Sequence, residues 1–317
     1  MMLNTYPLLV GTTLYIGASN AQWDFVVFCI TMLVICIIIG FLAALAGVGG
    51  AVLFTPIMMA FTAINTDVIR TTGLAIATVG SLIASRQYLS KGLANFNAII
   101  LTAVPYTVSS ILGAVLGLEI TRSFGNVGVA SIRLGLAALM LFIVGLFLWR
   151  GRQVDIPNSV NKVDRIARIF QLENARYYEE SLRTVVTYKA VNTVWGLLCF
   201  IGVGLVSGMF GVGAGWAIVP VYNLVMYLPL KVAAATSKVL IAIGDTGALW
   251  VYINSGALVF PFLAPCVIGM VLGTELGVRV MPKAKIPIIR WVIIAVMLIT
   301  SVRLFQQAIP ILMGWSP

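Results

Sequence analysis

Apolar residues along this chain gather into ten long blocks separated by short polar or glycine-containing stretches. The blocks lie at about residues 24–46, 51–66, 71–89, 95–121, 129–149, 190–209, 212–229, 232–254, 257–280 and 286–305. One bilayer crossing by a helix takes roughly 20 apolar residues, and most of the blocks approach or exceed this length. The pattern therefore predicts an all-α polytopic membrane protein embedded in the lipid bilayer.

A polar segment at residues 150–189 separates five apolar blocks from the other five. It holds eight basic and five acidic residues, and its pattern favours a short amphipathic helix followed by a β-hairpin. We therefore divide the chain into an N-terminal lead-in (1–23), a first membrane repeat (24–149), a polar loop (150–189) and a second membrane repeat (190–317). The lead-in is interpreted as uncleaved because it has no basic start, with a cleaved signal peptide as the alternative.

The two membrane repeats resemble each other in sequence. At an offset of 164 residues, Gly47, Gly49 and Pro56 match Gly211, Gly213 and Pro220. Further on, the segment GAVLGLE at 113–119 matches GMVLGTE at 269–275, an offset of 156, which predicts an eight-residue insertion ahead of it in the first repeat. So many ordered matches indicate an internal duplication.

The basic residues favour a particular topology for this duplication. With five crossings per half and the 150–189 loop inside, 15 basic residues lie inside and 4 outside, Arg70 being among the latter. If the short blocks 51–66 and 212–229 were re-entrant, we would expect four crossings per half and a count of 11 against 8. The first arrangement agrees better with the positive-inside rule, so we expect two inverted repeats in the cell membrane, a cytoplasmic loop and both termini outside.

Composition excludes several functions. The 317 residues are 61% hydrophobic and 9% charged, and they include no histidine, so Ser-His and Cys-His nucleophiles and imidazole-bound metals are absent. Asp245 has no second mid-membrane aspartate to form a proteolytic pair, and no GxxxxGK[ST] motif is present. The net charge of +10 follows from membrane topology and does not indicate nucleic acid. We expect no enzyme activity, no cofactor and no metal.

Two glycine clusters are the first candidate site. Glycines break a helix and let a ligand approach the backbone, and the helix that starts after each break directs free N–H groups and a positive dipole end toward it. Paired breaks from inverted repeats tend to meet near the membrane midplane and bind substrate, which here favours an anion. Close helix packing is the alternative reason for the glycines. The candidate residues are Gly47, Gly49, Gly50, Gly211, Gly213, Ala214 and Gly215.

The other candidate site residues are polar residues at the start of, or within, the apolar blocks 71–89 and 232–254. Thr71 and Thr72, together with Thr236 and Ser237, either donate to an oxyanion or bond back to their own helix carbonyls. Lys238 and Asp245 are seven residues apart and so share a helix face. Lys238 either attracts the anion or extends toward the interface, and Asp245 either carries a coupling proton or is hydrogen-bonded structurally.

The glycine segments resemble the TauE/SafE-type sulfite exporter family. The segment GLVSGMFGVGAGWAIVP at 204–220, followed by AAATS at 233–237, carries the likeness, as does GFLAALAGVGGAVLFTP at 40–56, and the resemblance covers about 40–310. It implies a membrane permease for small sulfur-containing anions such as sulfite or sulfoacetate. Ala214 within the glycine run and Lys238 after Thr-Ser depart from the usual pattern and indicate a different or more strongly charged site.

The functional hypothesis is a secondary transporter that exposes a small-molecule anion alternately to the two sides of the membrane. An anion channel is the main alternative, and a receptor or structural membrane protein is a further one. The substrate, its direction, the coupling ion and the oligomeric state, a homo-oligomer included, stay open.

Overall fold

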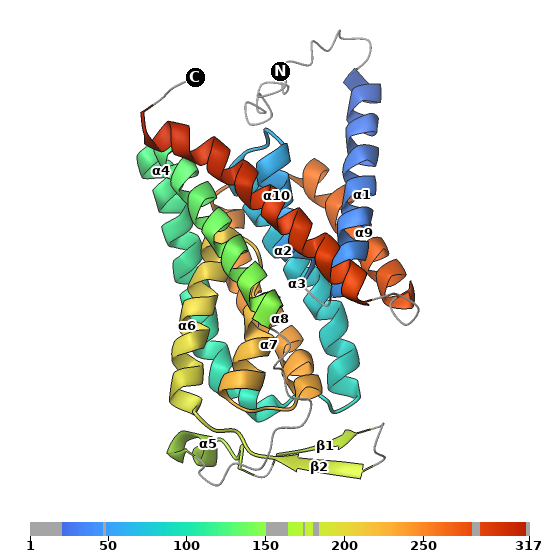
Figure 1. The fold of residues 1–317 in the computed structure, drawn as a ribbon, viewed down its shortest axis with the longest axis vertical. Coiled ribbons are helices and arrows are strands. Elements are labelled where there is room, and N and C mark those ends of the chain that lie inside the picture. Colours follow the sequence, from blue (N-terminus) through green and yellow to red (C-terminus); the bar gives the residue numbers. More distant parts are fainter. Residues whose placement is uncertain are drawn as a thin grey trace.

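A computed structural model describes residues 21–46, 49–149, 164–173, 175–179, 184–280 and 286–314, and almost all of them are helical (Figure 1). The first half contains α1 (Ala21–Ala46), α2 (Gly50–Phe61), α3 (Thr66–Ser90) and α4 (Phe96–Trp149). The second half contains α6 (Thr193–Phe210), α7 (Gly215–Pro220), the π-helical segment η3 (Val221–Val225), α8 (Leu230–Asn254), α9 (Phe260–Val280) and α10 (Ile286–Leu312). Between the halves lie α5 (Arg165–Ile169) and the antiparallel strands β1 (Ala175–Glu179) and β2 (Thr184–Tyr188). The predicted short helix and hairpin of the polar loop are thus both present.

Seven helices of the described chain are long and apolar enough to cross a membrane. One of them, α4, has 54 residues and bends at Gly125, whose backbone φ is +50°, so it forms two arms. Large apolar side chains such as Trp23, Val104 and Phe142 are more than half exposed on these helices. Such a surface is stable in lipid and not in water. The prediction of an all-α polytopic membrane protein is confirmed.

The topology with five crossings per half counts the blocks 51–66 and 212–229 as membrane spans, and this is wrong, because they form segments too short to span a bilayer. Helix α2 has 12 residues, and α7 with η3 covers 11, about 18 and 17 Å at 1.5 Å per residue. Each turns back along the helix before it. The base of the α6–α7 hairpin is closed by the Val191 amide donating to the Met226 carbonyl at 3.2 Å. Both glycine breaks therefore lie at the tips of helical hairpins.

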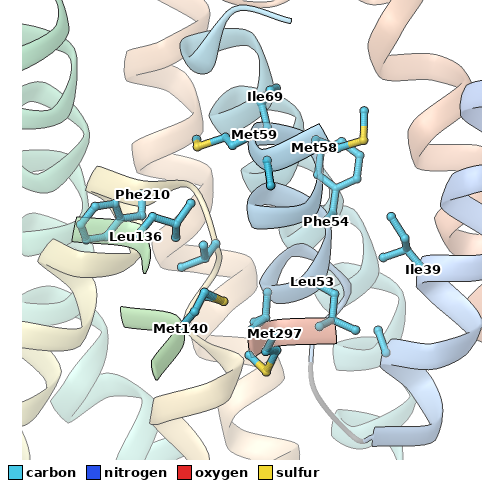
Figure 2. Packing of buried hydrophobic residues seen from close by; sticks show 14 of the residues in the cluster. Ile39, Leu53, Phe54, Met58, Met59, Ile69, Leu136, Met140, Phe210 and Met297 are labelled. Carbon is cyan, nitrogen blue, oxygen red and sulfur yellow. The ribbon is translucent and has the colours of Figure 1, made fainter. Parts of the chain in front are cut away.

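Helix α2 is enclosed by other helices. Figure 2 shows its side chains Leu53, Phe54, Met58 and Met59 surrounded by residues of α1, α4 and α10. All four are 2% exposed or less. Methionine side chains adapt to irregular gaps, so they suit a short helix wedged between longer ones. The tip at Gly49 is thereby held in the interior of the molecule.

The two halves interlock through glycine contacts. Helix α1 packs along α9, and α6 packs along the first arm of α4. A Cβ atom on Gly113 would overlap the backbone of Leu205, and one on Gly277 would lie 2.7 Å from the Phe41 carbonyl oxygen. These pairs are related by the offset of 164, so in the packing Gly113 corresponds to Gly277. The predicted insertion ahead of Gly113 is not needed for this contact, and the segment 269–275 that matches 113–119 in sequence begins two helical turns before Gly277.

The α5 and β1–β2 segment covers one end of the helix bundle. Tyr177 and Tyr188 belong to the same buried cluster as Tyr222 of η3. The Asn95 side chain donates to the Tyr188 hydroxyl at 2.6 Å, and the Asn95 amide donates to Thr236 Oγ1 at 3.0 Å. Burial raises the pKa of Tyr188 to about 12, so its hydroxyl stays protonated at neutral pH. This segment is therefore tied to the α3–α4 loop and to the start of α8.

Candidate functional site at the hairpin tips

The tips of the two hairpins meet inside the helix bundle. A Cβ atom built on Gly215 would lie 3.7 Å from the Gly49 amide nitrogen and 3.6 Å from a methyl of Ile241. A Cβ on Gly49 would have no neighbour within 4 Å among the residues that the structure describes. The glycine segments are therefore neighbours in space although they are more than 160 residues apart, and free room remains beside Gly49.

Helix starts converge at this junction. The N-caps of α2 and α7 are Gly49 and Ala214, and neither makes a side-chain capping hydrogen bond. The first bonded amides are Val52, which donates to the Gly49 carbonyl at 3.1 Å, and Ala217, which donates to the Ala214 carbonyl at 3.0 Å. Amides before them have no intrahelical acceptor, so they provide N–H donors and the positive end of the helix dipole.

Side chains of neighbouring helices lie close to the backbone of Gly213. Its φ is +66°, and a Cβ there would lie 2.8 Å from the Ala77 methyl, 3.7 Å from the Ala51 methyl and 3.4 Å from Asp245 Oδ2. Only glycine takes this conformation without strain and leaves this space. Small residues of α2 and α3 thus surround the second tip, with one carboxylate beside it.

Asp245 is the ionisable group at the junction. The residue is fully buried on α8, and its Oδ1 accepts hydrogen bonds from the Tyr106 hydroxyl at 2.5 Å and from Ser207 Oγ at 3.2 Å. Its Oδ2 has no hydrogen-bond partner among the described residues. The unpartnered oxygen is the one that faces Gly213. The carboxyl group is therefore held by α4 and α6 and directed at the second tip.

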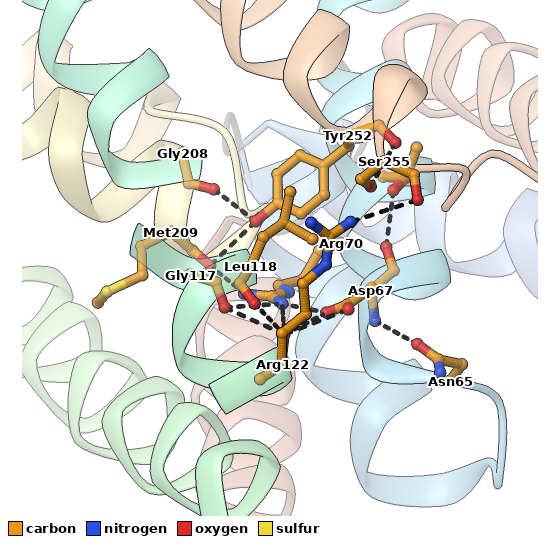
Figure 3. Close-up of polar contacts among 12 residues, drawn as sticks. Asn65, Asp67, Arg70, Gly117, Leu118, Arg122, Gly208, Met209, Tyr252 and Ser255 are labelled. Atoms are coloured by element: carbon orange, nitrogen blue, oxygen red, sulfur yellow. Dashed lines mark hydrogen bonds and ion pairs between the residues drawn. The ribbon is translucent and has the colours of Figure 1, made fainter. Parts of the chain in front are cut away.

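A second charged cluster is centred on Arg70 (Figure 3), and a Cβ atom on Gly211 would lie 2.6 Å from the Arg70 Cα. Arg70 of α3 is fully buried, forms an ion pair with Asp67 and donates to the carbonyls of Met209 at 2.9 Å and Gly117 at 3.2 Å. Its guanidinium carbon lies 5.3 Å from the centre of the Tyr252 ring. The topology count places Arg70 in a loop between two blocks, and this is wrong, because Arg70 lies within α3 and is buried against the carbonyls of α6 and α4.

The predicted hydroxyl residues are buried close to their own helix backbone. Thr71 donates to the Asp67 carbonyl at 2.7 Å, Thr72 to Val68 at 2.9 Å and Ser237 to Ala234 at 2.7 Å. A hydroxyl whose hydrogen bonds a carbonyl is not available to donate to an anion in the same state. Thr236 instead accepts from the Asn95 amide.

The remaining predicted residues are placed as follows. Lys238 is half-buried on α8, about 10 Å along the helix from Asp245. A Cβ on Gly50 would lie 2.6 Å from the Met270 sulfur, so Gly50 packs against α9. Gly47 lies outside the described residues. The structure thus brings together Gly49, Gly213, Gly215 and Asp245, and it places Thr71, Thr72, Thr236 and Ser237 in other contacts.

Sequence reasoning missed the partners of both charges. Tyr106 and Ser207 contact Asp245 from α4 and α6, more than 35 residues away along the chain. A tyrosine or serine in an apolar block is common, and no spacing rule links these to an aspartate. Arg70 carried a usable signal: with Asp67 it forms an i,i+3 pair at the start of a helix capped by Asn65, so it belongs to the helix and not to a loop.

A bundle of apolar helices around a buried polar junction defines a multi-pass membrane protein with an internal site. The family model described as Sulfite exporter TauE/SafE matches residues 32–304. The probable membrane transporter protein YunE of Bacillus subtilis (strain 168) is 22% identical over 288 residues, 88% of this chain and 98% of that protein. The probable membrane transporter protein MJ0441 of Methanocaldococcus jannaschii is 22% identical over 276 residues, 83% of this chain and 90% of that protein. No solved structure matches the chain significantly.

The chain belongs to the TauE/SafE sulfite exporter family, because the match covers most of its length. Together with the apolar helices, the family and these relatives identify it as a multi-pass membrane transporter.

Proposed function

We propose that this protein is a secondary transporter that binds a small anion between the two hairpin tips and exposes it alternately to each side of the membrane. The observation that carries the proposal is the closeness of Gly49 and Gly215, such that a Cβ on Gly215 would lie 3.7 Å from the Gly49 amide nitrogen, which brings two uncapped helix starts together. Backbone N–H groups and two positive dipole ends favour a compact negative charge there. The family description makes sulfite and related sulfur oxyanions the first substrates to test.

The packing of the hairpins supports the alternating movement. Each hairpin belongs to one half of the chain and packs along a helix of the other half, through α1 with α9 and α6 with α4. In Figure 1, α1 and α6 run in opposite directions, as two inverted repeats would. Rocking of one half against the other would therefore move the two tips relative to each other and change the side from which the anion between them can be reached.

Gly49 provides the sharpest test of the binding site. Its φ is −61° and a Cβ there meets nothing within 4 Å, so a larger side chain fits the backbone and fills the free room. We expect Gly49→Leu to lower uptake of radiolabelled sulfite, thiosulfate or sulfoacetate into proteoliposomes by at least about tenfold, with little change in melting temperature, since it removes the anion's space and not a core contact.

Gly80 is the matched control, because it lies on α3, is exposed, and would also leave a Cβ without neighbours. Gly80→Leu should retain uptake. A folded Gly49→Leu protein with normal uptake would refute the site. Counterflow between labelled and unlabelled anion distinguishes a carrier from a channel.

A further inference from the structure

We propose that Asp245 binds one proton whenever the anion binds, so that the transporter moves a proton and an anion in the same direction. This inference rests on the proposed anion site and names its coupling ion. It starts from the unequal environment of the two carboxyl oxygens, of which Oδ1 accepts two hydrogen bonds and Oδ2 accepts none among the described residues.

A bare carboxylate is poorly solvated at this position. Asp245 is 0% exposed, and no ion pair of this residue is found in the described part of the chain. A buried unpaired charge is avoided by taking up a proton or a cation. Because Tyr106 and Ser207 both donate to Oδ1, the free position for a proton is on Oδ2.

The protonated and the charged forms of the Asp245 carboxyl group have opposite effects on an anion bound at the tips. A charged Oδ2 beside Gly213 would repel an anion held at the tips. A protonated Oδ2 is neutral and becomes an O–H donor directed at the second tip. Anion binding and protonation therefore favour each other. The step forms an O–H bond with a proton from one side of the membrane and breaks it on the other side, and the anion itself is unchanged.

The surroundings fit a proton better than a metal cation. Hard cations such as Ca²⁺ and Mg²⁺ take six or more oxygen ligands. The described atoms around Gly213, which Oδ2 faces, include the methyls of Ala77 and Ala51. The nearby hydroxyls of Tyr106 and Ser207 already donate to Oδ1. Among the described residues, these neighbours of Gly213 supply no set of oxygen ligands of the kind that such divalent cations require.

Charged groups on the packed helices do not neutralise Asp245. Helix α4 presents Tyr106 and α6 presents Ser207, and α2 and α7 contain no charged residue. The charge on α3 nearest in sequence to Ala77 is Arg70, which is paired with Asp67. On α8 itself, Lys238 lies about 10 Å away along the axis. The position in the first half that corresponds to Asp245 is occupied by Ser81. The duplicated site therefore has one acidic side chain, which corresponds to one proton per transport cycle.

The test uses the full-length protein in proteoliposomes with thiosulfate and sulfoacetate, which stay fully ionised between about pH 5.5 and pH 8.5, as carboxylates do above their pKa. With acid outside, we expect the wild type to take up anion several-fold faster than without a gradient and to acidify an enclosed pH dye only when anion is present. Asp245→Asn, which keeps a neutral hydrogen-bond donor, should retain anion counterflow but lose both gradient effects. Asp24→Asn, a change in the first turn of α1, is the matched control and should retain both.

Each outcome decides a different point. If the wild type takes up anion but ignores the pH gradient, or follows a sodium gradient instead, the proton proposal is overturned. It is also overturned if folded Asp245→Asn keeps the gradient effects, or loses counterflow altogether. If the variant fails to fold, Asp245→Ser replaces it, since the first half has serine there, and the wild-type dye measurement decides on its own. Absence of binding and uptake of every anion by the wild type would instead refute the proposed function.

Discussion

Arg70 and Asp245 are both fully buried charges beside the second hairpin tip, yet their surroundings differ in kind. Arg70 contacts three helices, with an ion pair to Asp67 and hydrogen bonds to the carbonyls of Met209 and Gly117. Only its Nε lacks a partner among the described residues. Asp245 has two hydroxyl donors, both on one oxygen, and no oppositely charged partner within the described part of the chain.

This difference indicates that Arg70 stabilises the fold, whereas Asp245 is the residue proposed to gain and lose a proton. Met209 is at the C-terminal end of α6, where carbonyls are unpaired and the helix dipole is negative, so a guanidinium is stabilised there. Arg70 thereby fixes the point at which α6 ends and the tip begins. The free oxygen of Asp245 faces the tip itself, so its protonation can change while the fold stays the same.

Removing the Arg70 charge is expected to have the largest effect. Arg70→Met removes the ion pair with Asp67 and the hydrogen bonds to the Met209 and Gly117 carbonyls and to the Thr121 hydroxyl. Breaking a buried pair in this way costs about 3–5 kcal/mol of folding free energy. We expect a markedly lower melting temperature in detergent and little folded protein at 37 °C.

The control is Arg279→Gln, because the Arg279–Glu275 pair has 72% and 62% exposed side chains. An exposed pair contributes about 0–1 kcal/mol, so this variant should melt like the wild type. A stable Arg70→Met protein with altered transport would show that Arg70 acts on the substrate, and the contrast with Asp245 would be lost.

Much of the fold followed from the sequence, whereas only part of the site did. Apolar blocks and glycine breaks are local signals, so they predicted most of the helices and the positions of the two breaks, but not that the short helices after the breaks fold back instead of crossing the membrane. The depth of Arg70 and the contacts of Tyr106 with Asp245 depend on which helices pack together. That packing depends on close helix contacts at glycines, such as Gly113 against the backbone of Leu205. The local sequence around a glycine does not identify the helix that packs against it.

Tyr106→Phe should have an intermediate effect that concerns transport more than stability. The change removes one donor to Oδ1 of Asp245 and keeps the ring that packs on Gly244. A hydrogen bond to a charged group contributes about 1.5–3 kcal/mol, so its loss favours the protonated acid by roughly one pH unit or more. We expect the pH of half-maximal thiosulfate uptake to move upward by about this amount. An unchanged pH profile would show that Tyr106 does not act through Asp245.

The smallest effect is expected for Tyr252→Phe, the corresponding change in the Arg70 cluster. The Tyr252 hydroxyl donates to the carbonyls of Gly208 at 3.0 Å and Met209 at 3.3 Å, while its ring lies over the Arg70 guanidinium. Phenylalanine keeps the ring contact and loses a hydrogen bond worth about 0.5–1.5 kcal/mol. The melting temperature should fall slightly, and uptake and its pH profile should match the wild type. If Tyr252→Phe shifted the pH profile as Tyr106→Phe does, the two charges would act as one network, and Arg70 would have to be counted with the transport site.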